Sequence, residues 1–491
     1  MKKKIKLNSN NILKIYTSKW TLIPLLAILI FLPAQATETN NSSLSGHARC
    51  DNQMECSEKS LSPVFSAKKI PEPDAVLSVV KKLASAEVAR LKSLETNPIP
   101  GKWGISTNWI SATFFVGTAK LTNIVDIPDV LAYNFETARR FNYAHQGGGA
   151  PVHLINADDQ AIGDLYQSLF LRTGSPGMLM PLQQRLDYTL PYLSFSPEPK
   201  RLVWWWCDSL FMAPPVLTRM SAITGDPKYI NAMDVQYWRT YNRLYDHKEK
   251  LFARDERFIE RRSENGKKIF WSRGEGWVVA GLARILEAMP ENYPSRPQYV
   301  KLFKEMMASI VKLQQPDGLW RASLHDLKAH PEPETSGTAF FTYAIGFGIN
   351  HGLLDRKRYL PHVLSGWAGL NNYILPNGIL GQVQTAGDQP VPTKRENSAL
   401  YASGAFILAG LEVAKLREEV TQLPIKLTAP SAITYHPSDM KPRTLSSNAT
   451  PEEIREFNRY IAERQASENL AFDPLVDDPH YKSPISSATG N

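Results

Sequence analysis

The sequence predicts an all-α protein whose helices form an (α/α)6 barrel, flanked by an N-terminal tail and a C-terminal extension. From about Pro71 to Leu416, apolar residues recur at positions i, i+3, i+4 and i+7, which is the period of an amphipathic helix. About twelve such stretches occur, and six inner and six outer helices require twelve. A helical solenoid would show a fixed repeat length, and the sequence has none.

The predicted helices are joined by short or moderate connections, with no convincing long strand between them. They span roughly residues 73–95, 108–122, 126–144, 157–173, 177–190, 206–224, 227–246, 274–288, 295–314, 334–352, 355–373 and 396–417. Capping residues support several boundaries: Gly225 ends one helix and Asp226-Pro227 begins the next. Either Thr335 or Ser336 is expected to cap the helix that follows it.

The N-terminus has the pattern of a secretory signal peptide, predicted to span residues 1–36. Six lysines lie before Trp20 and form a basic region. The stretch Trp20–Pro33 is apolar but too short to span a bilayer comfortably. Ala34-Gln35-Ala36 then forms a small-x-small cleavage site. An uncleaved membrane anchor is the alternative. Cleavage would place the mature protein in the periplasm.

Composition changes again on both sides of the predicted barrel. Residues 37–70 are polar and rich in Ser and Asn, as expected for a linker, and the barrel domain spans residues 71–420. Residues 421–491 form an extension with a charged amphipathic helix at about 450–470, opened by the capping box that starts at Thr450.

Charge and cysteine content exclude several functional classes. The formal net charge of +8 falls to +2 without residues 1–36, which hold six Lys and no acid, so nothing favours nucleic acid or an anionic membrane as a partner. Cys50 and Cys56 either form a small disulfide loop or remain two thiols, and Cys207 is expected to be a buried apolar residue. No zinc spacing, P-loop or Gly-x-Ser-x-Gly motif occurs, so no metal or cofactor is predicted.

The run Trp204-Trp205-Trp206-Cys207-Asp208 is the first candidate for chemistry. Successive helical side chains point about 100° apart, so three adjacent tryptophans cannot all face one core. Nearby indoles raise the pKa of Asp208 by desolvation, whereas a helix N-terminus lowers it. Such a carboxyl group can both donate and accept a proton near neutral pH. A simple helix cap is the alternative, and the aromatic setting favours proton transfer.

Three further motifs contain polar residues at predicted helix starts. In Asn156–Gly163, one of Asp158 and Asp159 is expected to cap the helix and leave the other available, although both could merely cap it. In Trp271–Trp277, Arg273 could hold a carboxylate bidentately while the two flanking tryptophans stack on a sugar; a Gly-rich turn with packed tryptophans is the alternative. In Glu332–Gly337, capping is favoured over substrate contact.

Together these motifs resemble glycoside hydrolase family 105, the unsaturated rhamnogalacturonyl hydrolases, which are related to the unsaturated glucuronyl hydrolases of family 88. The resemblance covers roughly residues 100–418. It rests on the segments 206–215, 271–277 and 334–337, with weaker matches at 317–320 and 401–416. It implies an (α/α)6 barrel, in agreement with the helix count.

The resemblance also implies an unusual reaction, removal of a 4,5-unsaturated uronic acid from polysaccharide-lyase products by hydration of its enol ether. Asp208 would protonate C4 and assist water in attacking C5, and the resulting hemiketal would open and release the remaining sugar. Asp159 resembles the family's second acid, whose charge would raise the pKa of Asp208. The matching substrate contacts are Trp271, Arg273 and Trp277, with Trp109 a weaker candidate for the sugar wall.

One departure from the family concerns the loop at residues 251–255. Many members carry a His there, whereas this loop contains Arg254, a cation that would suit a more negatively charged substrate. Pectic rhamnogalacturonan and a sulfated algal polysaccharide such as ulvan therefore both remain candidates. A non-catalytic sugar-binding protein is disfavoured by the acid pair Asp208 and Asp159. A conventional glycosidase or a lyase on the same barrel is the other alternative.

Overall fold

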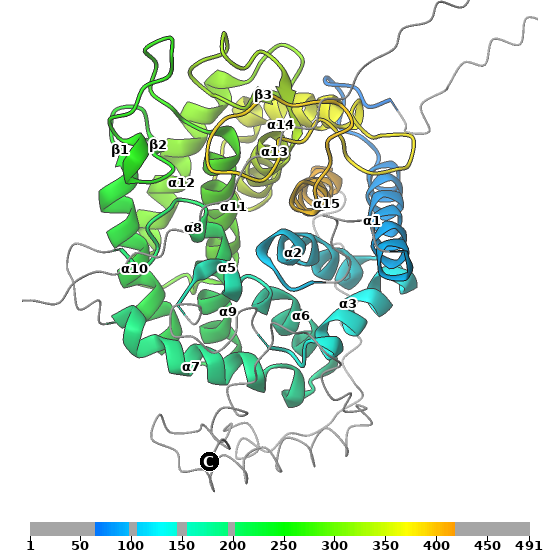
Figure 1. Ribbon diagram of the computed structural model, residues 1–491, viewed down its shortest axis with the longest axis vertical. Coiled ribbons are helices and arrows are strands. Elements are labelled where there is room, and N and C mark those ends of the chain that lie inside the picture. The colour runs from blue at the N-terminus through cyan, green and yellow to red at the C-terminus, as the bar shows by residue number, and fades with distance from the viewer. Residues whose placement is uncertain (1–63, 98–105, 145–154, 195–201, 418–491) are drawn as a thin grey trace, which may run out of the picture. The chain divides into compact units, whose positions relative to one another are not determined.

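The computed structural model describes residues 64–97, 106–144, 155–194 and 202–417 (Figure 1). These residues belong to one compact unit of the chain, Lys59–Asn491. The predicted signal peptide, the linker up to residue 63 with Cys50 and Cys56, and the C-terminal extension with its helix at 450–470 lie outside the described residues.

Six helices of the described part form a closed inner ring. Each contacts the next in chain order, and the last contacts the first, as Figure 1 shows end-on. The helices that face the interior are buried on all sides; on α13, for instance, every residue from Thr335 to Ile349 is buried. The ring consists of α2 (Trp109–Ile124), α6 (Gly163–Thr173), α9 (Pro214–Thr224), α11 (Ser272–Ala288), α13 (Thr335–Asn350) and α15 (Leu400–Ala414).

Six outer helices alternate with the inner ones along the described chain and pack against them. They bury one face only, as on α12, where Tyr299, Leu302, Phe303 and Met306 are buried at helical spacing. This arrangement is the (α/α)6 barrel that the sequence predicts. The outer helices are α1 (Pro73–Thr96), α3 (Pro128–Arg140), α7 (Met180–Ser194), α10 (Lys228–Leu244), α12 (Arg296–Ile310) and α14 (Arg356–Asn371).

Two predicted helices are each divided in the structure. The one at 157–173 is α5 (Ala157–Gln160) followed by α6, and the one at 206–224 is α8 (Ser209–Met212) followed by α9. The second division has a clear cause: Pro214 and Pro215 lack the N–H groups that a continuous helix would need. Each division leaves a short helix, α5 or α8, beside the residues of the candidate site.

The helix caps agree in part with the sequence. Gly225 ends α9 with a φ of 71°, and the Asp226 side chain accepts a hydrogen bond from Lys228 N as α10 begins. At α13 the expectation for Thr335 or Ser336 is wrong. Glu334 caps this helix instead, because its carboxylate reaches the N–H groups of the two residues that follow Thr335.

A glycine on α11 allows α8 to lie directly against this inner helix. A Cβ atom at Gly281 would come within 2.2 Å of the Leu210 carbonyl oxygen on α8. Only glycine permits so close an approach of the two backbones. The contact fixes the start of α8, which immediately follows Asp208.

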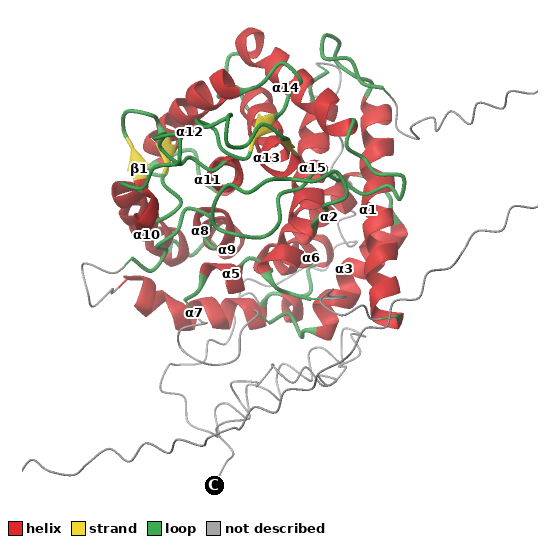
Figure 2. Ribbon diagram, turned by 45° about the horizontal axis from the view of Figure 1, so that its top comes forward, coloured by secondary structure: helices red, strands yellow, loops and turns green. Residues whose placement is uncertain are grey.

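In the described part of the chain, the strands form two short antiparallel pairs in the loops, while helices make up most of the regular structure (Figure 2). β1 (Tyr245–Asp246) pairs with β2 (Leu251–Phe252), and β3 (Trp320–Arg321) pairs with β4 (Pro333–Glu334). Within the described ranges, no helix combines the length and apolarity needed to cross a membrane.

Candidate active site

Asp208 lies immediately before α8, in a segment pinned to the loop that follows β2. Cys207 N donates to Arg254 O at 2.8 Å, and Trp206 forms an isolated antiparallel bridge with Asp255. Although Asp208 occupies the position preceding α8, its side chain makes no capping hydrogen bond, and only 7% of the residue is exposed. The simple-cap alternative is therefore not realised, and the carboxylate is available for other contacts.

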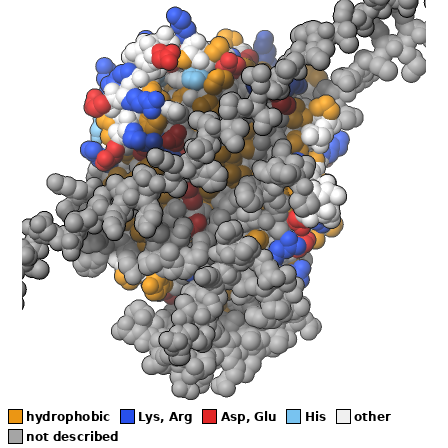
Figure 3. Space-filling model, in the orientation of Figure 1, with side chains coloured by type: hydrophobic (Ala, Val, Ile, Leu, Met, Phe, Trp, Pro, Cys, Tyr) orange, Lys and Arg blue, Asp and Glu red, His pale blue; other side chains and the backbone are white. Residues whose placement is uncertain are grey.

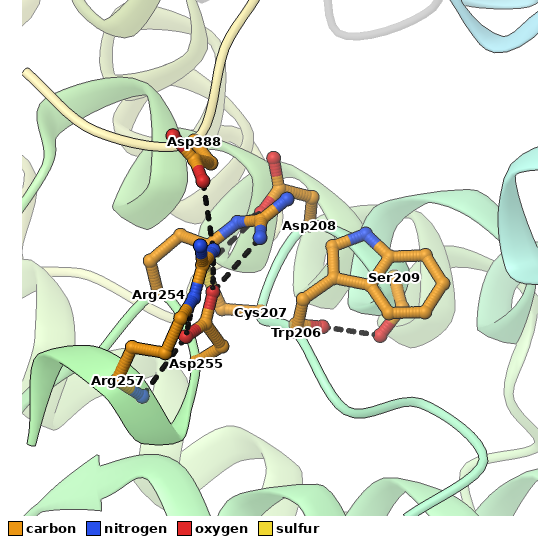
Figure 4. A network of polar contacts seen from close by, with 8 residues as sticks. All are labelled: Trp206, Cys207, Asp208, Ser209, Arg254, Asp255, Arg257 and Asp388. Atoms are coloured by element: carbon orange, nitrogen blue, oxygen red, sulfur yellow. Dashed lines mark hydrogen bonds and ion pairs between the residues drawn. The ribbon is translucent and has the colours of Figure 1, made fainter. Parts of the chain in front are cut away.

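Arg254 holds the Asp208 carboxylate from one side. Its Nε donates to Asp208 Oδ2 at 3.2 Å, and its Nη1 donates to Asp255 Oδ2 at 2.8 Å (Figure 4). The thiol of Cys207 lies 3.6 Å from the same Oδ2. Burial raises the pKa of Asp208, while the charge of Arg254 lowers it, and the net result is a raised pKa. Burial and the charge of Arg254 together thus determine the pKa of Asp208.

Asp158 and Asp159 stand on the short helix α5. The expectation that one of them caps this helix is wrong, because Asn156 Oδ1 accepts from Asp158 N and does so instead. Asp159 is buried, with 7% of the residue exposed. Burial raises the pKa of Asp158 to about 7, helped by the charges of Asp208 and then Asp159. The structure therefore brings this acid pair and Asp208 into one electrostatic group.

Sequence reasoning selected Asp159 and gave no separate role to Asp158. Neighbouring carboxyl groups disfavour simultaneous ionisation and titrate as a coupled set. At Asp158, burial is the main cause of the pKa of about 7, and the charges of Asp208 and Asp159 add to it. The doubled Asp in the sequence was the available signal, but only the fold shows that Asp158 faces the charge of Asp208.

The three consecutive tryptophans do not share one environment, as predicted, although they lie in a non-helical segment rather than in a helix. Trp204 is fully buried and Trp206 is 6% exposed, whereas Trp205 is 48% exposed. The guanidinium carbon of Arg254 lies 5.5 Å from the centroid of the Trp205 ring. One of the three rings thus faces solvent beside the cation that contacts Asp208.

Arg273 is fully buried on α11 and uses its terminal nitrogens on the chain itself. Nη1 donates to Gln384 O and Nη2 donates to Thr385 O, each at 2.8 Å. Its guanidinium carbon lies 4.4 Å from the Trp271 ring centroid and 4.8 Å from that of Tyr401. The nitrogens predicted to grip a substrate carboxylate are occupied by backbone carbonyls. The charge of Arg273 nevertheless lowers the pKa of Asp208.

The aromatic residues predicted as substrate contacts differ in exposure. Trp271 is 2% exposed and donates from Nε1 to Gln384 Oε1 at 2.7 Å, and Trp277 is 1% exposed and packs 4.8 Å from the Phe211 ring. Trp109 is partly buried and stacks on Tyr401 at 5.6 Å with an 18° angle between the planes. In this arrangement Trp271 and Trp277 support the walls of the site, and their contact with substrate stays a prediction.

Two acids missed by sequence reasoning hold the Arg254 loop in place. Asp255 is 2% exposed and also accepts from Arg257, whose Nη2 pairs with Asp388 at 2.7 Å (Figure 4). Glu275 is 1% exposed, and its carboxyl oxygens lie 2.9 and 3.1 Å from the N–H of Phe252, two residues before Arg254. Glu275 lies within the motif at 271–277, but its role could not be predicted because its partner, Phe252 N, is 23 residues away in the sequence.

Within the described residues, no group of three or more His, Cys, Asp or Glu side chains is arranged to hold a metal ion. What the site offers is a buried carboxyl group with a raised pKa, a permanent cation bonded to it, and a second carboxyl group that titrates near neutral pH. This arrangement suits general acid–base chemistry on an uncharged double bond or ether.

The chain is similar to known proteins over most of the barrel. The sequence model of the family described as Glycosyl Hydrolase Family 88 matches residues 79–417. The chain is 37% identical over 348 residues to the unsaturated 3S-rhamnoglycuronyl hydrolase of Formosa agariphila, which covers 68% of this chain and 91% of that protein.

Two solved structures are similar over 70% of the chain. A glycosyl hydrolase family 88 protein from Bacteroides vulgatus is 27% identical with a TM-score of 0.63 and is covered over 99% of its length. A protein titled a polysaccharide lyase is 28% identical with a TM-score of 0.62 and is covered over 97% of its length.

Proposed function

Because the chain belongs to Glycosyl Hydrolase Family 88, we propose that it acts on a sulfated, rhamnose-containing oligosaccharide and that Asp208 carries the proton transfer. The relation to families 105 and 88 that the motifs predict is confirmed. The chain is a glycoside hydrolase that removes the 4,5-unsaturated uronic acid from the non-reducing end of polysaccharide-lyase products.

The observation that carries the role of Asp208 is that its carboxyl group is buried, with a raised pKa, and forms an ion pair with Arg254. Protonated Asp208 donates its proton to C4 of the enol ether, which leaves an oxocarbenium ion at C5. Water then adds to C5 and gives its proton back to the carboxylate. The C5 hemiketal opens to a ketone, which frees a hemiacetal at C1, and this hemiacetal expels the remaining sugar.

Asp208 must hold a proton before the reaction and accept one during it. Burial favours the protonated form of Asp208. The Asp158 carboxyl group, with a pKa of about 7, is coupled to Asp208 by charge and also titrates near neutral pH. Arg254 opposes both effects and stabilises the carboxylate that forms after C4 is protonated. Unlike a His at this position, an Arg stays cationic across the whole physiological pH range.

A sulfated substrate is supported by the cation Arg254 beside Asp208. The loop that follows Arg254 exposes Arg257, Arg261 and Arg262, interspersed with Glu256, Glu260 and Glu264. Figure 3 shows Lys and Arg side chains with Asp and Glu side chains among them at the upper left of this face. The name of the Formosa agariphila relative, in which we read 3S as a 3-sulfate, points to the same chemistry. Pectic rhamnogalacturonan products are the alternative.

The test compares three substrates with the mature protein: the sulfated product of an ulvan lyase, the same product after desulfation, and the product of a rhamnogalacturonan lyase. Loss of the ultraviolet absorbance of the conjugated double bond reports hydration. We expect the highest kcat/KM on the sulfated product. Equal or higher kcat/KM on the desulfated or pectic product would contradict the substrate proposed, and an increase in absorbance from uncleaved polysaccharide would reveal a lyase.

We also propose that the enzyme works in the periplasm, because residues 1–36 have the charge and apolarity of a cleaved signal peptide. Expression of the full chain in a Gram-negative host followed by osmotic release should yield a protein that begins at Thr37. Retention of residues 1–36 in the membrane fraction would favour an uncleaved anchor.

A further inference from the structure

Trp205 is the one tryptophan among the exposed large hydrophobic side chains of the described residues. Its neighbours Trp204 and Trp206 are buried, and Trp204 O accepts a hydrogen bond from Thr240 at 2.6 Å. Cys207 N is bonded to Arg254 O as well. The backbone on both sides of Trp205 is therefore fixed, and the indole projects from a rigid base rather than from a loose loop.

A single side chain, that of Arg254, contacts both the Trp205 ring and the Asp208 carboxylate. Arg254 lies 5.5 Å from the ring centroid and 3.2 Å from Asp208 Oδ2, and its side chain is only 14% exposed. The Trp206 ring also packs against Trp205, with centroids 4.9 Å apart and planes tilted by 50°. An exposed aromatic ring by itself is ordinary, but one braced beside a reactive group is pre-organised for binding.

The direction of the substrate follows from which end of it reacts. The unsaturated ring is at the non-reducing end, so every sugar that follows it must extend away from Asp208 toward solvent. Asp208 is buried and the Arg254 side chain is only 14% exposed, whereas Trp205, which contacts Arg254, is 48% exposed. A sugar that extends from Asp208 past Arg254 toward solvent would meet the exposed part of this indole.

Resting on the proposed function, we propose that Trp205 is the binding platform for the sugar that follows the unsaturated uronic acid. A flat indole offers a large apolar surface to the C–H face of a sugar ring and loses little conformational entropy when it binds, since its position is already fixed. The Arg254 guanidinium, which lies over the indole, favours a sugar ring that carries an anionic substituent. Trp205 would thus select the leaving sugar, while Asp208 acts on the ring before it.

The experiment uses two substrates that share the unsaturated uronic acid: the lyase-derived disaccharide, and the methyl glycoside, which lacks a second sugar. For each variant we consider the ratio of kcat/KM on the disaccharide to kcat/KM on the methyl glycoside. Trp205→Ala should lower this ratio about tenfold, mostly through KM. Trp205→Phe, which keeps a flat ring, should keep it within about twofold of the wild type.

Trp205→Leu is the matched control for apolarity, since it keeps an apolar side chain without a flat face. The proposal expects it to behave like the Ala variant, and it provides a second reading if the Ala variant folds poorly. A ratio that stays at the wild-type value in both variants would overturn the proposal. So would equal losses on the two substrates with a displaced pH profile, because Trp205 would then act through Arg254 on Asp208. A wild-type protein that consumes neither substrate would instead refute the proposed function itself.

Discussion

Replacing Arg254 with Gln removes the cation whose Nε lies 3.2 Å from Asp208 Oδ2. An opposite charge at this range lowers the pKa of a carboxyl group by about 1–3 pH units. Arg254 also serves Asp255, so we expect the lower part of that range. Its removal should raise the pKa of Asp208 by about 1–2 pH units, equivalent to roughly 1.4–2.7 kcal/mol.

The direction of the effect on activity follows from the need for a protonated acid. Because Asp208 is active while it holds its proton, the fall of kcat/KM at high pH reports its deprotonation. Arg254 also lowers the pKa of Asp158, which is about 7, so loss of the cation raises both pKa values. The basic limb of the profile should therefore move to higher pH, and the maximal rate should fall because the acid becomes weaker.

The assay follows the loss of ultraviolet absorbance from one lyase product across the neutral and alkaline range. Arg257→Gln is the matched control, since Arg257 pairs with Asp255 and Asp388 in the same network. We expect its basic limb to stay within about 0.3 pH units of the wild-type position, because it does not bond to the reactive carboxylate. The reasoning is refuted if Arg254→Gln retains the wild-type melting temperature and its basic limb stays in place or moves to lower pH.

Three further substitutions test the surroundings of the site. Asp158→Asn removes a like charge, so the pKa of Asp208 should fall. The basic limb of the pH profile of kcat/KM should therefore move to lower pH, opposite to its movement in Arg254→Gln. A limb that stays in place would show that the two carboxyl groups are not coupled. Glu275→Gln mimics the protonated form of a carboxyl group whose pKa burial raises well above 4.5. The folded wild type binds this proton more tightly than the unfolded chain, so the stability of the wild type declines as pH rises above about 4.5. The melting temperature of the variant should therefore rise relative to that of the wild type by about 1–3 °C between acidic and neutral pH. A difference in melting temperature that does not change with pH would contradict a buried neutral carboxyl group. Gly281→Ala places a Cβ atom 2.2 Å from Leu210 O. It should lower the free energy of unfolding, measured by heat or urea, by about 1–3 kcal/mol and should reduce kcat. A variant as stable and active as the wild type would contradict the close contact of α8 with α11.

The barrel could be predicted from the sequence because its helices carry a strong local signal. Inner helices such as α13 are apolar on every side, and outer helices such as α12 carry one apolar face, so length and spacing identify both kinds. The division between α5 and α6 was not predicted. Ala161 and Ile162 keep helical backbone angles there, and the local signal, Gly163 at the first position of α6, is a weak one, since continuous α11 also contains Gly276 and Gly281.

The site could be predicted only as far as its chemistry is local. Asp208 could be named because it lies in a motif with aromatic neighbours, and Arg254 because it replaces the His that many family members carry in this loop. The contacts of Arg273 could not, because its partners Gln384 and Thr385 lie more than a hundred residues away and offer only backbone carbonyls. The pKa of Asp158 likewise depends on Asp208, which is brought close only by the closed ring of helices.

The most direct test of the central claim is the rate at which Asp208→Asn consumes the double bond of a lyase-derived oligosaccharide. Asparagine keeps the shape of the side chain but cannot donate the proton to C4. We expect kcat to fall by about 10²–10⁴-fold with an unchanged melting temperature, whereas the wild type removes the absorbance completely. A variant that retains kcat within about tenfold of the wild type would contradict proton transfer by Asp208.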